Sequence, residues 1–157
     1  LFSSAASDVY KRQFVDIAID RDGRWFHEGS EIKRVELVSL FAGLLRREDD
    51  GAYYLVTPVE KVEVAVALHP LMVVDATHVD DTTTGQSRLG LILNSGGVFY
   101  LDDETGLTPE PAAAGAAFIL LPNKLTALFT RAAWYRLVDM ADDDGCVESG
   151  GRKYSLL

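Results

Sequence analysis

The residues best suited to bind a ligand lie in the run Thr57-Pro58-Val59-Glu60-Lys61. A lysine ammonium can pair with a phosphate, a threonine hydroxyl can donate a hydrogen bond, and a glutamate can accept one from a ribose or a base edge. Proline has no backbone N–H to donate to a sheet, so this run is expected at a strand end or a sheet edge. The alternative is a structural crossover whose charged side chains pair with one another in solvent.

Two arginines and an aromatic pair extend this candidate site. Arg46, at the predicted end of a helix, can hold phosphate oxygens in its planar fork, although a cation there also complements the helix dipole. Arg131 interrupts an apolar stretch, so its charge must face solvent or a partner. Trp25 and Phe26 are neighbours on a predicted strand, and their side chains therefore point to opposite faces, one to the core and one to a surface that can stack a base. The predicted ligand-binding residues are Trp25, Arg46, Thr57, Glu60, Lys61 and Arg131.

Residues suited to catalysis or metal binding do not form a recognisable pattern. The three histidines are not at metal-ligand spacing, and the single cysteine, Cys146, has no second thiol nearby. No G-x-S-x-G elbow frames Ser39, Ser87 or Ser149. The two Ser-Gly-Gly runs lack the spacing of a phosphate-binding loop and are interpreted as hairpin turns. We therefore expect no catalytic residue, no metal and no cofactor. A small hydrolase or transferase with an unrecognised site is kept as an alternative to the two functions stated at the end of this section.

Composition limits the class of partner. The chain has 157 residues, enough for one ordinary domain or two small ones, and 48% of them are hydrophobic, which is typical of a globular protein. Its formal net charge of −9 and the lack of a basic face argue against polymeric nucleic acid, but a local basic pocket can still hold a small anion. The apolar runs are shorter than the roughly 18 residues of a membrane span. The lone cysteine fits a reducing compartment, so a cytoplasmic location is expected.

The first residues are expected to be foreign to the protein. LFSSAASDVYKRQ has no apolar periodicity and no secretory pattern. Asp8 to Gln13 can be encoded by the end of a transposon library adapter, so residues 1–13 are predicted to be adapter-derived and the natural protein to enter near Phe14.

The elements that must position the candidate site follow from hydrophobic periodicity. Residues 14–20 alternate as a half-buried strand, and 24–27 are predicted to return as its hairpin partner. Apolar residues recur at helical spacing over 33–47, and the acidic turn that follows ends the helix before a strand at 52–56. The core positions of this first part are Trp25, Val35, Val38, Phe41 and Leu44.

The second part is predicted to be mostly strands. Four β-branched or aromatic runs separated by turn residues indicate an antiparallel meander over 62–68, 71–79, 88–94 and 98–101. A loop, a strand, a second helix and a last hairpin are predicted at 102–115, 117–121, 125–141 and 146–157.

An internal echo links the two parts. When Trp25 is aligned with Ile119 without a gap, the strand, turn, helix and acidic turn of both parts coincide. This agreement fits a duplication, but any two strand-turn-helix units of similar length would align in the same way.

The stretch GRWFHEGSEIKRVELVSLFAGLLRREDDGAYYLVTPVEKVEV, residues 23–64, resembles the signature of a bacterial family called domain of unknown function 1285 (DUF1285). TRAAWYRLVDMA at 130–141 and ESGGRKYSL at 148–156 are similar to the closing helix and hairpin of that family. The resemblance implies a two-part α+β fold with a duplicated core, whose second part is superficially like a pleckstrin-homology domain. It also implies a nucleotide-type ligand at the interface of the two parts and a role in signalling.

The sequence therefore predicts an α+β protein of two small packed units, an N-terminal α+β unit over 14–61 and a C-terminal β-meander and helix unit over 62–157. The predicted function is a non-enzymatic ligand-binding or sensory module of bacterial signalling. Its ligand would be a small, nucleotide-like anion held at the interface of the units. The alternative is a protein-interaction adaptor that docks a partner through a sheet edge or an apolar seam.

Overall fold

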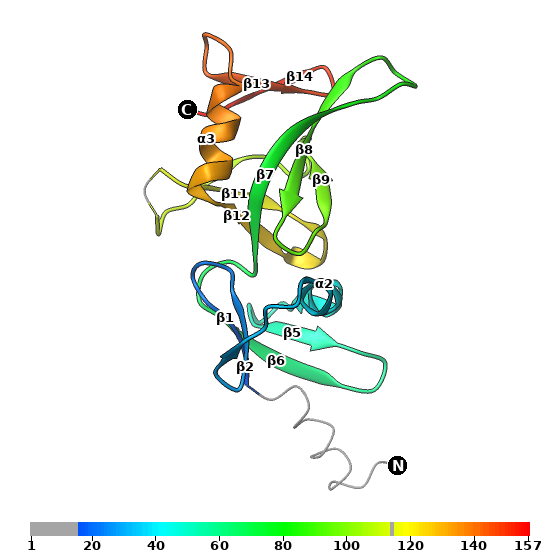
Figure 1. The fold of residues 1–157 in the computed structure, drawn as a ribbon, viewed down its shortest axis with the longest axis vertical. Helices are drawn as coiled ribbons and strands as arrows, with labels where there is room; N and C mark the ends of the chain where they lie inside the picture. The colour runs from blue at the N-terminus through cyan, green and yellow to red at the C-terminus, as the bar shows by residue number, and fades with distance from the viewer. Residues whose placement is uncertain (1–15, 114) are drawn as a thin grey trace, which may run out of the picture. The chain divides into compact units, whose positions relative to one another are not determined.

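The computed structural model describes residues 16–113 and 115–157 (Figure 1). They form two compact units, the first comprising the chain up to Pro70 together with Asn123–Leu125, and the second comprising Leu71–Pro122 and Thr126–Leu157. Each unit combines strands with a helix, so the predicted α+β class is confirmed. The segment predicted to be adapter-derived, residues 1–13, lies outside the described residues.

The first unit is one six-stranded sheet with a helix. Its strand order is β3-β2-β1-β6-β5-β4, and only the β1–β6 pair among these neighbours is parallel. The strands are β1 (Ile17–Ile19), β2 (Trp25–His27), β3 (Ser30–Glu31), β4 (Leu45–Arg47), β5 (Tyr53–Val56) and β6 (Lys61–Val66), and the helix is α2 (Val35–Leu44). The core of the unit consists of alternate strand residues together with one helix residue: Ile17, Ile19, Trp25, Val38, Leu45, Tyr53, Leu55 and Val64.

Helix α2 is shorter than the helix predicted over 33–47. It ends at Leu44, and Leu45 is extended with φ −77° and ψ 137°. Leu45 is fully buried and pairs with Leu55 of β5, and this burial in the sheet outweighs its helical periodicity. Arg46 therefore lies on the edge strand β4, and the prediction that it occupies the last turn of a helix is wrong.

The two units divide later than the predicted boundary after Lys61. Strand β6 pairs with β5 on one side and with β1 on the other, so it lies inside the first sheet. The division falls between Pro70 and Leu71. For the same reason the predicted four-stranded meander has three strands, because its first run is β6 of the other sheet.

The second unit contains another six-stranded sheet, in the order β10-β11-β12-β7-β8-β9. Strands β7, β8 and β9 form the antiparallel meander, and β12 joins β7 in parallel. These strands are β7 (Leu71–Asp80), β8 (Ser87–Leu93), β9 (Val98–Tyr100), β10 (Thr108–Pro109), β11 (Ala117–Leu120) and β12 (Thr126–Phe129). A short 3-10 turn, η1 (Pro122–Lys124), precedes β12.

Helix α3 (Arg131–Asp139) begins later than the helix predicted over 125–141. The residues before it form β12, which is hydrogen-bonded to β11 and β7. Thr130 separates strand from helix, and its Oγ1 accepts a hydrogen bond from the backbone N–H of Ala133 at 3.1 Å. The helix buries Ala133 and Leu137 and packs mainly against β7.

The last hairpin is confirmed as β13 (Cys146–Ser149) and β14 (Arg152–Ser155), a sheet of its own (Figure 1). Ser149, only 2% exposed, fixes it to the large sheet. Its Oγ donates a hydrogen bond to the carbonyl of Leu101 at 2.7 Å and accepts one from the N–H of Leu89 at 2.9 Å. The internal duplication and the likeness to a pleckstrin-homology domain stay predictions.

No helix in the described part of the chain combines the length and apolar character that a membrane crossing requires.

Candidate functional site

Trp25, the predicted stacking residue, belongs to the core of the first unit. It is 1% exposed, and its ring stacks on Phe41 with a centroid distance of 6.2 Å. Its Nε1 is buried without a hydrogen-bond partner among the described residues. The neighbouring Phe26 is half-buried beneath the guanidinium of Arg24, at 5.9 Å. Trp25 therefore presents no face that a ligand can stack on.

The run from Thr57 to Lys61 forms the turn between β5 and β6 and not a crossover between units. The Oγ1 of Thr57 accepts a hydrogen bond from the N–H of Glu60 at 3.0 Å, so the turn uses this hydroxyl. The Nζ of Lys61 lies 3.1 Å from a carboxylate oxygen of Glu48 and 4.5 Å from the ring centroid of Tyr54. These contacts lie within the first unit, and the partner of Lys61 is Glu48 and not the neighbouring Glu60.

The remaining two predicted residues lie in different units. Arg46 is exposed on β4 and pairs in register with Tyr54 of β5, whereas Arg131 is the exposed first residue of α3 in the second unit. Neither unit by itself assembles the six predicted residues.

A concave surface in the second unit, which the sequence did not indicate, brings more polar groups together. Two hollows of about 440 and 480 Å³ share Arg88, Tyr100, Asp102 and Glu104. The first extends to the β13–β14 hairpin, and the second extends to the end of β11. We call the two hollows together the β9 groove. Its remaining lining residues are Val98, Phe99, Leu101, Asp103, Thr105, Leu120, Leu121, Pro122, Ser149, Gly150, Arg152 and Tyr154.

Arg88 is the central cation of the groove. Its guanidinium carbon lies 3.7 Å from the centroid of the Tyr100 ring, a stacked cation–π contact between neighbouring strands. Within the residues that the structure describes, Arg88 forms no ion pair with a carboxylate. The side chain is exposed, so the N–H edges of its fork are open to a ligand.

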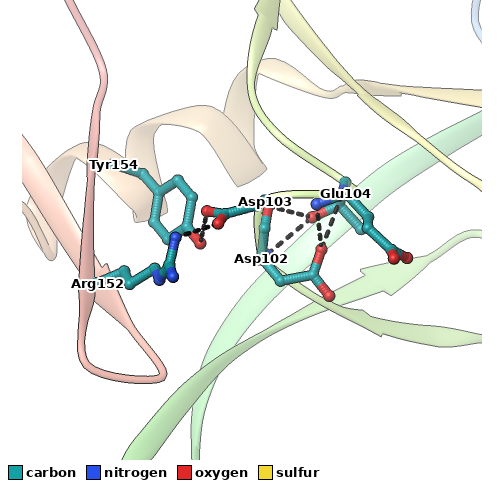
Figure 2. A network of polar contacts seen from close by, with 6 residues as sticks. Asp102, Asp103, Glu104, Arg152 and Tyr154 are labelled. Carbon is teal, nitrogen blue, oxygen red and sulfur yellow. Dashed lines mark hydrogen bonds and ion pairs between the residues drawn. The ribbon is translucent and has the colours of Figure 1, made fainter.

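A second cluster closes one end of the groove (Figure 2). Arg152 forms an ion pair with Asp103, and the hydroxyl of Tyr154 donates a hydrogen bond to the other oxygen of the same carboxylate at 3.0 Å. Burial and this hydrogen bond raise the pKa of Tyr154. The carboxylate of Asp103 therefore has two partners from β14 and is neutralised locally.

The loop after β9 holds its own shape. One carboxylate oxygen of Asp102 accepts hydrogen bonds from the N–H groups of Glu104 and Thr105, at 2.9 and 2.8 Å. The Oγ1 of Thr105 accepts from the N–H of Asp102 at 2.9 Å and donates to the carbonyl of Tyr100 at 3.2 Å. Figure 2 shows that the Glu104 carboxylate points away from the Arg152 cluster. Glu104 is therefore presented on a fixed loop.

Neither a metal-ligand cluster nor a serine–histidine pair lies among the described residues that line the groove. Among the described residues, no group of three or more His, Cys, Asp and Glu side chains can hold a metal ion. The Oγ of Ser87 lies 3.4 Å from the Nδ1 of His78, but this long contact is between residues that do not line the groove. What the groove offers is a pre-oriented arginine fork, tyrosine rings and carboxylates that are mostly engaged.

Comparison with known proteins identifies relatives of the whole chain. A family model described as domain of unknown function (DUF1285), N-terminal domain, matches residues 10–67. The crystal structure of a DUF1285 family protein from Silicibacter pomeroyi DSS-3 is similar, with 32% sequence identity and a TM-score of 0.74, over 91% of this chain and 80% of that chain. A DUF1285 family protein from Shewanella baltica OS155 is 27% identical with a TM-score of 0.63, over 78% of this chain and 90% of that chain. No curated protein matches the sequence.

Proposed function

The chain belongs to the DUF1285 family, and we propose that it is a non-enzymatic module that binds a small anionic ligand in the β9 groove through Arg88. The observation that carries the proposal is the stack of the Arg88 guanidinium on Tyr100 at 3.7 Å, with no ion pair to a carboxylate among the described residues. A planar guanidinium binds a carboxylate or a phosphate with two parallel hydrogen bonds.

The stack favours binding because it orients the fork before the ligand arrives. A free arginine side chain loses rotamer entropy when it closes on an anion, and a stacked one has already lost part of it. A cation–π contact of this kind stabilises the held conformation by about 0.5–1 kcal/mol at an exposed site. Arg88 is thus better prepared than Arg46, for which the structure gives no such contact.

The acidic residues of the groove oppose an anion less than their number suggests. Asp102 is held by two backbone N–H groups, and Asp103 is neutralised by Arg152 and Tyr154. Among the described residues, the Glu104 carboxylate has neither a backbone nor a side-chain partner, and it points away from the Arg152 cluster (Figure 2). The ligand class is therefore a small carboxylate or phosphate, and nucleotides belong to it.

We assign the module to bacterial signalling in the cytoplasm. The lone cysteine fits a reducing compartment, and both related crystal structures come from bacteria. A sensory role fits a site whose arginine can hold a small anion.

Titrations of the full chain with inorganic phosphate, a mononucleotide and citrate, followed by amide NMR shifts, test the proposal. At least one probe is expected to shift residues around Arg88, and Arg88→Ala is expected to weaken its binding about tenfold or more, which corresponds to ~1.4 kcal/mol. Arg88→Lys keeps the charge but loses the fork, so it is expected to weaken binding as well.

Arg46→Ala and the double variant Lys61→Ala/Arg131→Ala are the matched controls, since they remove exposed cations of the site first predicted. Both are expected to bind the probes as the unchanged chain does. No shift with any probe, or equal binding by the Arg88→Ala variant, would overturn the proposal. Loss of binding in the double variant would return the site to the residues predicted from the sequence.

A further inference from the structure

Strand β9 has a free edge. It is the last strand of its sheet, and among the residues that the structure describes β8 is its one neighbouring strand. The N–H of Leu93 bonds to the carbonyl of Gly97, and the N–H of Leu101 bonds to the carbonyl of Leu89. In an antiparallel pair such bonds recur at every second residue, so the odd-numbered residues of β9 face β8. The N–H and C=O groups of Val98 and Tyr100 point away from the sheet.

Part of this edge is already used by the chain itself. The carbonyl of Tyr100 accepts the hydroxyl of Thr105 at 3.2 Å. Three backbone groups are left without a partner among the described residues: the N–H and C=O of Val98 and the N–H of Tyr100. Such a row of groups pairs with another extended chain, in the manner of strand addition.

The second hollow of the groove lies directly beside this edge. Its wall is apolar on the sides of β9 and β11, where Val98 and Leu120 are 47% and 49% exposed although both side chains are hydrophobic. At about 480 Å³ the hollow is in the size range of small-molecule sites, so it has room for a large side chain. Its charged residues are Arg88, Asp102 and Glu104, so acidic groups outnumber basic ones by one.

We propose that β9 is the docking edge for an extended peptide of a protein partner, which adds as a further strand beside Val98. The peptide places an apolar side chain between Val98 and Leu120 and a basic side chain near Asp102 and Glu104. Successive strand residues point to alternate faces, and both peptide side chains enter the same hollow. They therefore have an odd number of residues between them, as positions i and i+2 do. Because β9 has only three residues, the main chain contributes few bonds and the side-chain contacts decide which peptide binds.

Charge distinguishes this occupant from a second copy of the chain. The formal net charge of −9 makes two copies repel one another, whereas a basic peptide is attracted to the same surface. The proposal does not depend on the small-anion site, because it rests on the backbone of Val98 and not on the side chain of Arg88.

The test uses a fluorescent peptide of alternating threonine and valine with one lysine on the valine face, titrated with the full chain. Val98→Pro removes the outward N–H and leaves the β8–β9 bonds of Gly97, Phe99 and Leu101 in place, a position where an edge strand accepts proline. It is expected to weaken peptide binding about tenfold or more. Val98→Ala keeps the N–H and is expected to weaken binding only a few-fold.

Two further peptides, one N-methylated at the odd-numbered residues and the other at the even-numbered residues, are titrated with the unchanged chain. This experiment tests the proposal even if the Val98→Pro variant does not fold. At least one of the two peptides is expected not to bind. Equal binding of both methylated peptides, equal binding by the Val98→Pro variant, or no binding at about 1 mM peptide would overturn the proposal. The proposal would also be overturned if sedimentation showed that the unchanged chain is a dimer and that the Val98→Pro variant is a monomer. The edge of β9 would then pair with a second copy of the chain.

Discussion

At the scale of single residues, Ser149 determines the shape of the candidate site. One buried hydroxyl joins the N–H of Leu89 on β8, the carbonyl of Leu101 at the end of β9, and the first strand of the last hairpin. Arg152 and Tyr154 come from the other strand of that hairpin, so their distance from Arg88 depends on this link. A residue interpreted from the sequence as part of a plain turn therefore positions one wall of the β9 groove.

Ser149→Ala is expected to destabilise the protein by about 1–3 kcal/mol, because it leaves a buried N–H and a buried carbonyl without partners. Urea unfolding measures the change. Ser39→Ala, at an exposed position of α2, is the control and is expected to have little effect. Equal stabilities of the two variants would show that water replaces the lost hydroxyl.

Of the core positions predicted for the first part, Trp25 and Val38 are buried, Phe41 and Leu44 are partly buried, and Val35 is 57% exposed, so the prediction for Val35 is wrong. The sequence predicts Trp25 both as a core residue and as a ligand-binding residue, because a large aromatic ring suits a core and a stacking site equally well. Arg88 was not singled out, because its contact with Tyr100 arises only when Gly90 pairs with Tyr100 in the β8–β9 register. Register is set by pairing between distant residues and leaves no local signal. One local signal for the loop after β9 is present in the sequence. Asp102 precedes Glu104 by two residues and Thr105 by three, a spacing typical of an Asx turn.

At the scale of elements, the two helices differ at their first turns. Thr130 caps α3 through its side chain, whereas Arg34 at the corresponding position of α2 makes no capping bond. A cation at this end also opposes the helix dipole. Tertiary packing therefore stabilises α2 without a contribution from an N-terminal side-chain cap.

Arg34→Asp is expected to stabilise the first unit by about 0.5–1 kcal/mol, since aspartate can accept the free N–H groups and has the favourable charge. The measurement is thermal unfolding, with an increase in Tm expected. Arg34→Ala removes the charge without adding a cap, and a gain no larger for aspartate than for alanine would exclude the capping explanation.

Most strands could be predicted from the sequence, because alternation and turn residues are local signals. The boundaries that failed lie where local and tertiary signals disagree. Leu45 and the residues 126–129 have helical periodicity, but each pairs in a sheet and buries apolar side chains there. The prediction of four meander strands was wrong for a similar reason, because no local feature of Lys61–Val66 indicates which sheet this strand joins.

At the scale of the whole molecule, stability in acid is expected to depend on several turns in which an aspartate carboxylate accepts the N–H of a later residue. The pKa values of Asp50, Asp81 and Asp142 are lowered, in each case chiefly by a hydrogen bond from a backbone N–H. The donors are Ala52, Thr83 and Cys146, respectively. A carboxyl whose pKa is lower in the folded state favours folding above its unfolded pKa, and this contribution is lost as the pH falls through the folded pKa.

Tm is therefore expected to change little with these groups between pH 7 and about pH 5, and to fall below about pH 4, near the ordinary carboxyl pKa. Thermal unfolding at a series of pH values measures this. In the variant Asp50→Asn/Asp81→Asn/Asp142→Asn the amide oxygens still accept the N–H bonds but do not titrate, so the acid decrease is expected to be smaller. An unchanged decrease would assign it to other carboxylates.

The parallel pairing of β1 with β6 determines when each part of the nascent chain can complete its structure. The first sheet consists of two three-stranded antiparallel blocks, joined only where Ala18 and Ile19 meet Ala65 and Val66. The blocks cannot join on the ribosome until β6 has been synthesised, and β7 lacks its second neighbour until β12 emerges. Until β12 has been synthesised, at least one side of β7 is therefore open, and a slow step between residues 80 and 126 would prolong that exposure.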